Sequence, residues 1–325
     1  MPLSTISIIG LGLIGGSLAL AAKNSGVTVH AWDIDQSTRD DARNHGVQVH
    51  ETLADIFSQE TEIVVLAVPL KHMAETLLKV AQQVSPDVTV TDVGSVKGSV
   101  LRAAREAGLG AQFVGAHPMA GTEESGFMAA QPKLFLGATW AVTPQQNCEQ
   151  QHVVQVLRMI THVFHGRALV LDADTHDQAV AHVSHVPHVL AHALLNSVQH
   201  SSIRSIAERL AAGSFRDGTR VARGNPQRNY AMIADNRAAV VPVLDNLIED
   251  LIVLKEALGE EHSGSARAFF AGELLSREAA EQPERLVLGE TWLDDVMDMG
   301  SAGRLVVHVA DVESSERGRI VVDYA

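Results

Sequence analysis

The sequence predicts a protein of the α/β class, with a doubly wound parallel sheet at the amino terminus followed by an all-helical domain. Two observations support this fold. Short β-rich runs alternate with helical patterns through the first half of the chain, and from about Asp172 the character changes to long helical stretches. At 325 residues, the chain is long enough for two domains with separate cores.

The β-rich runs are bounded by turn residues and separated by amphipathic segments. We expect strands at residues 5–9, 27–32, 62–68, 88–91, 113–116, 139–142 and 168–171. Strands joined by helices form a parallel sheet, whose ligands bind beyond the carboxyl ends of the strands. Residues 1–171 are therefore predicted to form one ligand-binding domain.

A glycine-rich turn follows the first predicted strand. Gly10, Gly12 and Gly15 come directly after the run Thr5–Ile9, an amphipathic helix follows, and the second strand ends at Asp33. In this context the glycines allow a tight turn, a close approach of a pyrophosphate and close packing of helix on sheet, while the carboxylate contacts a ribose hydroxyl. The first domain is thus predicted to be Rossmann-type and to bind NAD.

Long apolar helices characterise the second part of the chain. Helical spacing covers residues 175–200, 226–234 and 237–258, so residues 172–281 are predicted to form a helical domain. Helices more apolar than one small bundle can bury indicate a homodimer interface. Residues 282–325 are an extension of uncertain structure. A helix at 265–280 is expected before it, and two possible strands at 304–309 and 319–324 would make a hairpin within it.

Composition excludes several classes of protein. The net charge of −14 argues against nucleic-acid binding, and no stretch is long and apolar enough to span a membrane. We therefore expect a soluble protein. Its single cysteine excludes an intrachain disulfide, which favours a reducing cytoplasm but also fits some exported proteins. Cys148 lies in a polar stretch and is interpreted as a surface thiol. Seven arginines between Ile203 and Arg237 indicate a small anionic ligand, although a solvated helix face with ion pairs would look the same.

Polar residues follow two of the predicted strands. The segment Asp92–Lys97 follows one strand and His117–Glu123 follows the next, so both should open onto the ligand crevice. His117 is a candidate base, because an unperturbed imidazole has a pKa of about 6.5. Four histidines recur along one helical face, but Pro187 interrupts the helix and no Cys or Glu set completes a zinc-like shell. No metal site is expected. The four are His182, His185, His188 and His192.

Several motifs in a fixed order resemble the prephenate/arogenate dehydrogenase family of tyrosine biosynthesis. They are G-L-G-L-I-G-G-S-L-A, V-G-S-V-K, H-P-M-A-G-T-E-E-S-G, D-x-x-x-H-D, S-H-V-P-H and F-R-D-G-T-R-V-A, and they span about Ile6 to Leu258. The resemblance implies an NAD-dependent oxidative decarboxylation of prephenate to 4-hydroxyphenylpyruvate. Arogenate, which differs only in carrying an amino group in place of a keto group, is the alternative substrate.

The resemblance also implies roles for single residues. His117 would be the catalytic residue that hydrogen-bonds the substrate hydroxyl, and Ser95 would orient it and touch the nicotinamide. Arg220 would pair with a substrate carboxylate, and His185 would be a packing residue. The other expected substrate contacts are Glu123, His188, Arg216 and Thr122. The expected cofactor contacts are Gly10, Gly12, Leu13, Ile14, Gly15, Asp33, Val68 and Ser95.

Two other functions are compatible with a two-domain fold of this kind. A 3-hydroxyacid dehydrogenase would use a lysine of its helical domain as the acid/base, but residues 172–250 contain no lysine. A non-catalytic nucleotide-sensing protein would use the same nucleotide fold. The joint presence of Ser95, His117 and Arg220 argues against it.

Overall fold

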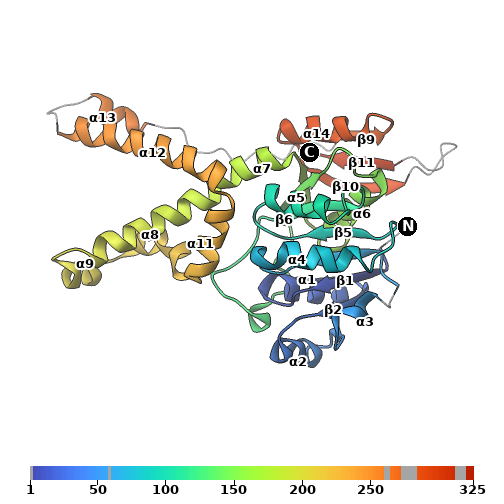
Figure 1. Ribbon diagram of the computed structural model, residues 1–325. Helices are drawn as coiled ribbons and strands as arrows, with labels where there is room; N and C mark the ends of the chain where they lie inside the picture. The colour runs from blue at the N-terminus through green and yellow to red at the C-terminus, as the bar shows by residue number, and fades with distance from the viewer. Residues whose placement is uncertain (1–2, 58–59, 260–263, 272–283, 312–319) are drawn as a thin grey trace. The chain divides into compact units, whose positions relative to one another are not determined.

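The computed structural model describes residues 3–57, 60–259, 264–271, 284–311 and 320–325. The chain divides into a first unit, Met1–His176 with Gln282–Ala325, and a helical unit, Asp177–Glu281 (Figure 1). Helix α7 (Ala173–Val180) contains the boundary, which lies close to the expected one at residue 171. Residues 282–325, expected as a separate extension, belong to the first unit.

The first unit alternates strands and helices as the sequence pattern predicts. Its elements up to residue 170 are β1 (Thr5–Ile9), α1 (Leu13–Asn24), β2 (Thr28–Trp32), α2 (Gln36–Asn44), β3 (Gln48–Val49), α3 (Leu53–Phe57), β4 (Ile63–Leu66), α4 (Leu70–Ala81), β5 (Thr89–Asp92), α5 (Gly98–Glu106), β6 (Phe113–Pro118), η1 (Phe127–Ala129), β7 (Thr139–Pro144), α6 (Gln150–Arg158), η2 (Met159–Val163) and β8 (Arg167–Val170). Every expected strand is present. The short β3 was not expected, because two residues carry no periodic signal.

The sheet is mixed rather than wholly parallel, which corrects the sequence-based prediction. The strand order is β3-β2-β1-β4-β5-β6-β7-β8-β10-β11-β9, and the strands from β3 to β6 are parallel. Strand β7 runs antiparallel to β6. Between them, residues 119–138 hold only the short η1, and no crossover helix returns the chain to the amino edge of the sheet. The next strand therefore starts at the carboxyl edge and runs back.

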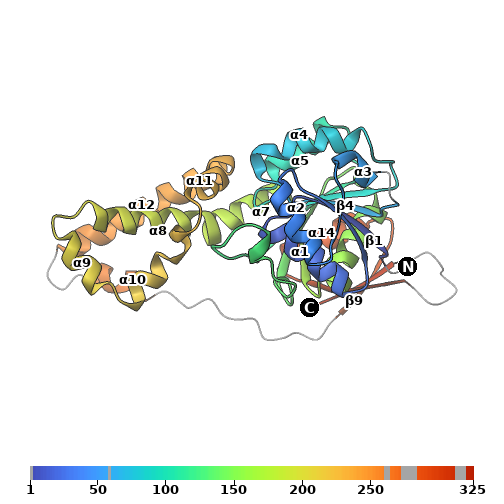
Figure 2. The ribbon, with the colours of Figure 1, turned by 90° about the horizontal axis from the view of Figure 1, so that it is seen from below.

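Successive side chains of the central strands enter two different cores. Ile8 and Val65 pack with α1 and α6 on one face, whereas Ile9 and Val64 pack with α4 and α5 on the other. Figure 2 shows α3, α4 and α5 together on one side of the sheet. Strands buried on both faces have near-continuous apolar sequences, which explains the V-V-L and I-S-I-I runs. The turns that lead from the parallel strands into the helices all lie at the carboxyl edge of these strands.

The carboxyl-terminal segment extends the same sheet. It adds β9 (Glu284–Leu288), α14 (Trp292–Ser301), β10 (Val306–Asp311) and β11 (Ile320–Tyr324). The expected hairpin is confirmed, since β10 and β11 pair antiparallel, and β10 also pairs with β8. Strand β9 and helix α14 were not expected. Helix α14 lies very close to β8, because a Cβ on Gly300 would stand 1.5 Å from the Val170 carbonyl oxygen.

The helical unit contains the long helices that the sequence predicts. Its elements are η3 (Ala181–His185), α8 (Val186–Gln199), α9 (Arg204–Leu210), α10 (Gly213–Gly218), η4 (Arg220–Arg223), α11 (Pro226–Asp235), α12 (Arg237–Leu258) and α13 (Gly264–Phe269). Helix α11 begins where Asn225 accepts hydrogen bonds from the amides of Gln227 and Arg228, with proline in the first turn. Of the helix expected at 265–280, the part beyond residue 271 lies outside the described residues.

Candidate active site

The glycine-rich turn joins β1 to α1. Gly10 adopts a left-handed conformation with φ of 98°, and a Cβ there would stand 2.6 Å from the carbonyl oxygen of Ala67. A Cβ on Gly15 would stand 1.9 Å from the carbonyl oxygen of Gly10, whereas a Cβ on Gly12 would point into open space. Gly10 and Gly15 are therefore required by close packing. Gly12 leaves room for a ligand at the amino end of α1.

The first turn of α1 can bind an anion. Gly12 caps the helix and has no side chain to accept hydrogen bonds from the first-turn amides, which have no partners within the helix. These amides and the helix dipole favour phosphate at this end. Leu13, just after the cap, is buried, and Ile14 and Val68 are half-buried. The residues here fit a dinucleotide pyrophosphate.

Asp33 is held by backbone amides at the end of β2. Its carboxylate accepts hydrogen bonds from the amides of Leu11, at 2.7 Å, and Asp35, at 2.9 Å. This fixes the carboxylate beside the glycine turn. A carboxylate at this position accepts a hydrogen bond from a ribose hydroxyl and repels a 2′-phosphate.

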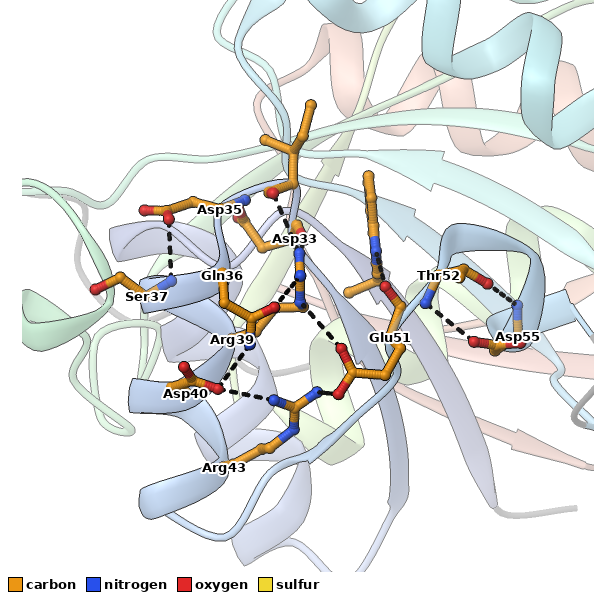
Figure 3. Close-up of polar contacts among 12 residues, drawn as sticks. Asp33, Asp35, Gln36, Ser37, Arg39, Asp40, Arg43, Glu51, Thr52 and Asp55 are labelled. Carbon is orange, nitrogen blue, oxygen red and sulfur yellow. Dashed lines mark hydrogen bonds and ion pairs between the residues drawn. The ribbon is translucent and has the colours of Figure 1, made fainter.

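Arg39 of α2 is occupied by contacts within the protein (Figure 3). One guanidinium nitrogen donates to the carbonyl oxygens of Asp33, at 2.6 Å, and Ile34, at 3.1 Å, and the other donates to the side chain of Gln36. Glu51, 4.0 Å from Arg39 Nε, is also paired with Arg43 at 2.6 Å. The guanidinium therefore stabilises the β2–α2 turn and is not oriented to receive a phosphate.

A buried ion pair joins the ends of β5 and β6. Asp92 and Lys97 are both fully buried and form a short ion pair, and Lys97 Nζ also donates to the carbonyl oxygen of Ala116 at 2.8 Å. Asp92 accepts hydrogen bonds from the amides of Gly94, at 2.8 Å, and Ala116, at 3.3 Å. The loop that carries the half-buried Ser95 is thereby tied to the strand that carries His117.

His117 lies within β6, one residue before its end, and is half-buried. Its Nδ1 lies 2.9 Å from Nε2 of His176 on α7, with the ring planes at 71° to each other. His176 is buried, and its amide donates to the carbonyl oxygen of Asp172 at 3.0 Å. His117 is thus held through Nδ1 by a buried partner.

Asp172 fixes the start of α7. Its carboxylate accepts hydrogen bonds from the amide of Thr175, at 2.8 Å, and from the Thr175 hydroxyl, at 2.6 Å. Partial burial disfavours the charged carboxylate, but the hydrogen bonds from Thr175 outweigh it and lower the pKa of Asp172 below its usual value. The loop after β6 carries a half-buried Thr122 and an exposed Glu123.

The remaining expected substrate contacts belong to the helical unit. Arg216 on α10 and Arg220 at the start of η4 are exposed, and η4 packs against α8, which carries His188. His188 Nδ1 donates to the carbonyl oxygen of Ser184 at 2.8 Å, which fixes the orientation of its ring. His185 is fully buried and bonded to the Asn236 side chain at 2.9 Å. A packing role for His185 fits this geometry.

Sequence reasoning did not assign a role to three residues near His117. Lys97 and His176 lie in the V-G-S-V-K and D-x-x-x-H-D motifs and Asp92 directly precedes the first of these, but their burial and their contacts become visible only in the fold. The interpretation of Cys148 as a surface thiol was wrong. Its side chain is buried, and burial, with a smaller contribution from Glu149, raises the pKa of the thiol to about 12. The polar sequence context was misleading because Gln146, Asn147 and Glu149 are exposed while Cys148 belongs to a buried apolar cluster.

Within the described residues, no three His, Cys, Asp or Glu side chains are grouped so as to hold a metal ion. His192, one of the four spaced histidines, instead lies 3.3 Å from the Asn229 amide. None of the described helices is both long and apolar enough to cross a membrane.

Comparison with known proteins gives matches over most of the chain. Residues 18–168 match the family model for the prephenate dehydrogenase nucleotide-binding domain, and residues 172–271 match that for the prephenate dehydrogenase dimerization domain. A cyclohexadienyl dehydrogenase of Zymomonas mobilis is 36% identical over 262 residues, which cover 79% of this chain and 89% of that protein.

Solved structures give a concordant result. The prephenate dehydrogenase of A. aeolicus, solved with hydroxyphenyl propionate and NAD⁺, is 28% identical with a TM-score of 0.77, and the match covers 83% of this chain and 96% of that one. The arogenate dehydrogenase of Synechocystis is 30% identical with a TM-score of 0.68, covering 78% and 92% respectively.

Proposed function

Because the chain belongs to the prephenate dehydrogenase family, we propose that it catalyses the oxidative decarboxylation of prephenate to 4-hydroxyphenylpyruvate with NAD. One observation supports this most directly. A half-buried histidine, His117, stands at the carboxyl end of a Rossmann-type sheet, and its Nδ1 is engaged by the buried His176. The reaction belongs to tyrosine biosynthesis.

The enzyme is an NAD-dependent dehydrogenase, and its own residues fit that cofactor. The open space over Gly12 and the amino end of α1 would hold the pyrophosphate. Asp33 would accept a hydrogen bond from the adenosine ribose. Ser95, Leu13, Ile14 and Val68 are proposed as further contacts.

The reaction needs a hydrogen-bond acceptor for the substrate hydroxyl. When bound, NAD supplies the acceptor for the hydride that leaves the hydroxyl-bearing ring carbon. As the hydride leaves, positive charge builds on the hydroxyl oxygen, and Nε2 of His117 stabilises it by accepting the hydroxyl hydrogen bond. The carbon–carbon bond to the ring carboxylate breaks, its electron pair enters the ring, and CO₂ departs. The shared proton stays with the phenol of the product, so the overall reaction neither consumes nor releases a proton.

Arginine would recognise the substrate carboxylates. Arg220 offers a planar guanidinium that binds a carboxylate through two parallel hydrogen bonds, and Arg216 adds positive charge in the same part of the helical unit. His188, Glu123 and Thr122 are proposed as further substrate contacts. The positive charge of this part of the chain matches a dianionic substrate despite the net charge of −14.

Arogenate is the second candidate substrate. It is favoured by the likeness to the Synechocystis arogenate dehydrogenase, which matches this chain at 30% identity. The two substrates share the ring, the hydroxyl and the ring carboxylate, so the same residues would serve both. Only groups that face the side-chain keto or amino group would discriminate between them.

An absorbance assay at about 340 nm, where reduced nicotinamide absorbs, tests the proposed function. Prephenate and arogenate are each offered with NAD and with NADP, and kcat/KM is measured for the four pairs. We expect the highest value for prephenate with NAD. A higher value with arogenate would establish the alternative substrate. No reduction of either cofactor with either substrate would refute the proposal.

We also propose that the enzyme is a homodimer that forms through the helical unit. The residues 172–271 match a dimerization-domain model. The core of the unit contains few buried apolar side chains, whereas many others are exposed on α9 and α12. Exposed apolar side chains in this number are a liability unless they are covered. We further propose that the protein is cytoplasmic, since its single cysteine cannot form an intrachain disulfide.

A further inference from the structure

The D-x-x-x-H-D motif has no role in the proposed function. Its histidine, His176, nevertheless lies next to His117, the candidate catalytic residue. His176 is 2% exposed, and its Nε2 lies 2.9 Å from Nδ1 of His117. The ring centroids are 5.2 Å apart in an edge-to-face arrangement. A hydrogen bond between two imidazole ring nitrogens has only two possible directions, and each determines what His117 can do.

The direction of this hydrogen bond decides whether His117 can accept from a substrate. If Nδ1 of His117 donates, Nε2 of the neutral ring is a lone pair that can accept the substrate hydroxyl hydrogen bond. If Nδ1 accepts from His176, Nε2 carries the proton and can only donate. The proposed reaction needs the first arrangement.

We propose that His176 is a positioning residue that accepts a hydrogen bond from Nδ1 of His117 and so fixes the tautomer and orientation of the catalytic imidazole. This inference rests on the proposed function of His117. Partners of this kind commonly set which ring nitrogen of a functional histidine carries the proton, and their loss costs about 10- to 100-fold in metal sites.

Separate contacts hold the backbone next to each of the two imidazoles. The hydrogen bonds from Thr175 to Asp172 fix the first turn of α7, and the His176 amide joins that turn through the Asp172 carbonyl. On the other side, the Asp92–Lys97 pair fixes the backbone at Ala116, next to His117. The two imidazoles are thus supported on separate elements, which makes their mutual orientation a property of the fold rather than of one loop.

The tautomer can be measured without substrate or cofactor. In protein labelled with ¹⁵N-histidine at about pH 8, long-range ¹H–¹⁵N correlations report which ring nitrogen carries the proton, and loss of one pattern in His117→Asn assigns it. We expect His117 to carry its proton on Nδ1 in the wild type. In His176→Leu we expect a mixture in which the Nε2–H form is prominent. A wild-type Nε2–H form would overturn the proposal, and so would an unchanged Nδ1–H form in His176→Leu.

Steady-state kinetics test the consequence for catalysis. His176→Leu should lower kcat about 10- to 100-fold and leave the KM for NAD unchanged. His176→Gln should recover most of the loss, because its amide oxygen can accept from Nδ1. His152→Leu is the matched control: His152 is also buried in the first unit and bonded to a neighbour, Thr89 at 2.8 Å, but that contact is at the amino end of β5. It should retain the wild-type kcat.

A double-mutant cycle separates positioning from general stability. His117→Asn alone should lower kcat about 10²- to 10⁴-fold, and adding His176→Leu should then cost little more, because the two residues act as a unit. Multiplicative losses would refute the coupling. If the wild type turned over neither prephenate nor arogenate, the proposed function would fail, whereas the tautomer measurement would still decide the role of His176.

Discussion

Cofactor choice is decided at the scale of single residues. Asp33 is fixed by two backbone amides, and Arg39, the nearby cation that could have received a 2′-phosphate, is bonded to the carbonyl oxygens of Asp33 and Ile34. Both features favour NAD. The arginine could be identified from the sequence, but its internal hydrogen bonds could not, since they depend on how the β2–α2 turn closes.

We predict that the wild-type enzyme prefers NAD over NADP by about 10²-fold or more in kcat/KM. Like charges that face each other cost several kcal/mol, and each 1.4 kcal/mol corresponds to a factor of about ten. Asp33→Ser should reduce the preference to about tenfold or less. Asp35→Ser, which removes a neighbouring charge but keeps a residue able to cap α2, should leave it unchanged. Similar wild-type efficiency with both cofactors would contradict this account of Asp33.

Substrate recognition gives a second prediction at this scale. Arg220→Lys should raise the substrate KM, with a loss on the order of 2 to 5 kcal/mol of binding free energy, because an ammonium cannot reproduce the planar guanidinium. The KM for NAD should hardly change. Arg209→Lys, in the same arginine-rich part of the chain but on α9, is the control. Equal losses for the two variants, or a parallel rise in the KM for NAD, would show that Arg220 does not bind the substrate carboxylate.

At the scale of elements, β5 and β6 are joined by the buried Asp92–Lys97 pair rather than by apolar packing alone. We predict that Lys97→Met destabilises the first unit by about 3 to 5 kcal/mol, because it leaves a buried carboxylate without its cation. All tryptophans (Trp32, Trp140 and Trp292) lie in this unit, so their fluorescence during urea unfolding reports its stability.

The control for this prediction is an exposed ion pair of the same type. Lys79→Met removes the pairing of Lys79 with Glu75 on α4, and both side chains are more than half exposed. Exposed pairs contribute little, so the unfolding midpoint should barely move. If Lys97→Met shifted the midpoint as little as Lys79→Met, the buried pair would not have the structural role inferred here.

Most helices and strands could be predicted from the sequence, and those that could not be predicted share a physical reason. The strands of the first half and the helices α11 and α12 were predicted closely, because their apolar periodicity and turn residues are local. The sequence did not predict the antiparallel direction of β7, nor the elements β3, β9 and α14. These features depend on pairings between distant segments. The proposed site residues His117, Ser95 and Arg220 were inferred from the resemblance of their motifs to those of the family. His176, Asp92 and Lys97 needed the fold, since burial and partners are not visible in a linear pattern.

At the scale of the whole molecule, the helical unit should determine the oligomeric state. We predict a dimer in sedimentation equilibrium at micromolar concentration. Leu251 and Ile252, adjacent on α12 and exposed at 45% and 46%, should lie in the interface, so changing both to glutamate should give monomers. Leu78→Glu, at an exposed apolar position on α4 of the first unit, should leave the dimer intact. A monomeric wild type would contradict the proposed assembly.

The central claim is that one active site removes a hydride and CO₂ from the same substrate molecule. The most direct measurement is the stoichiometry of the reaction with prephenate and NAD, with NADH followed by absorbance, CO₂ trapped and the phenolic product quantified. The account predicts one NADH, one CO₂ and one 4-hydroxyphenylpyruvate for each prephenate consumed. NADH formed without CO₂, as in a simple hydroxyacid dehydrogenase, or CO₂ released without NADH, would contradict it.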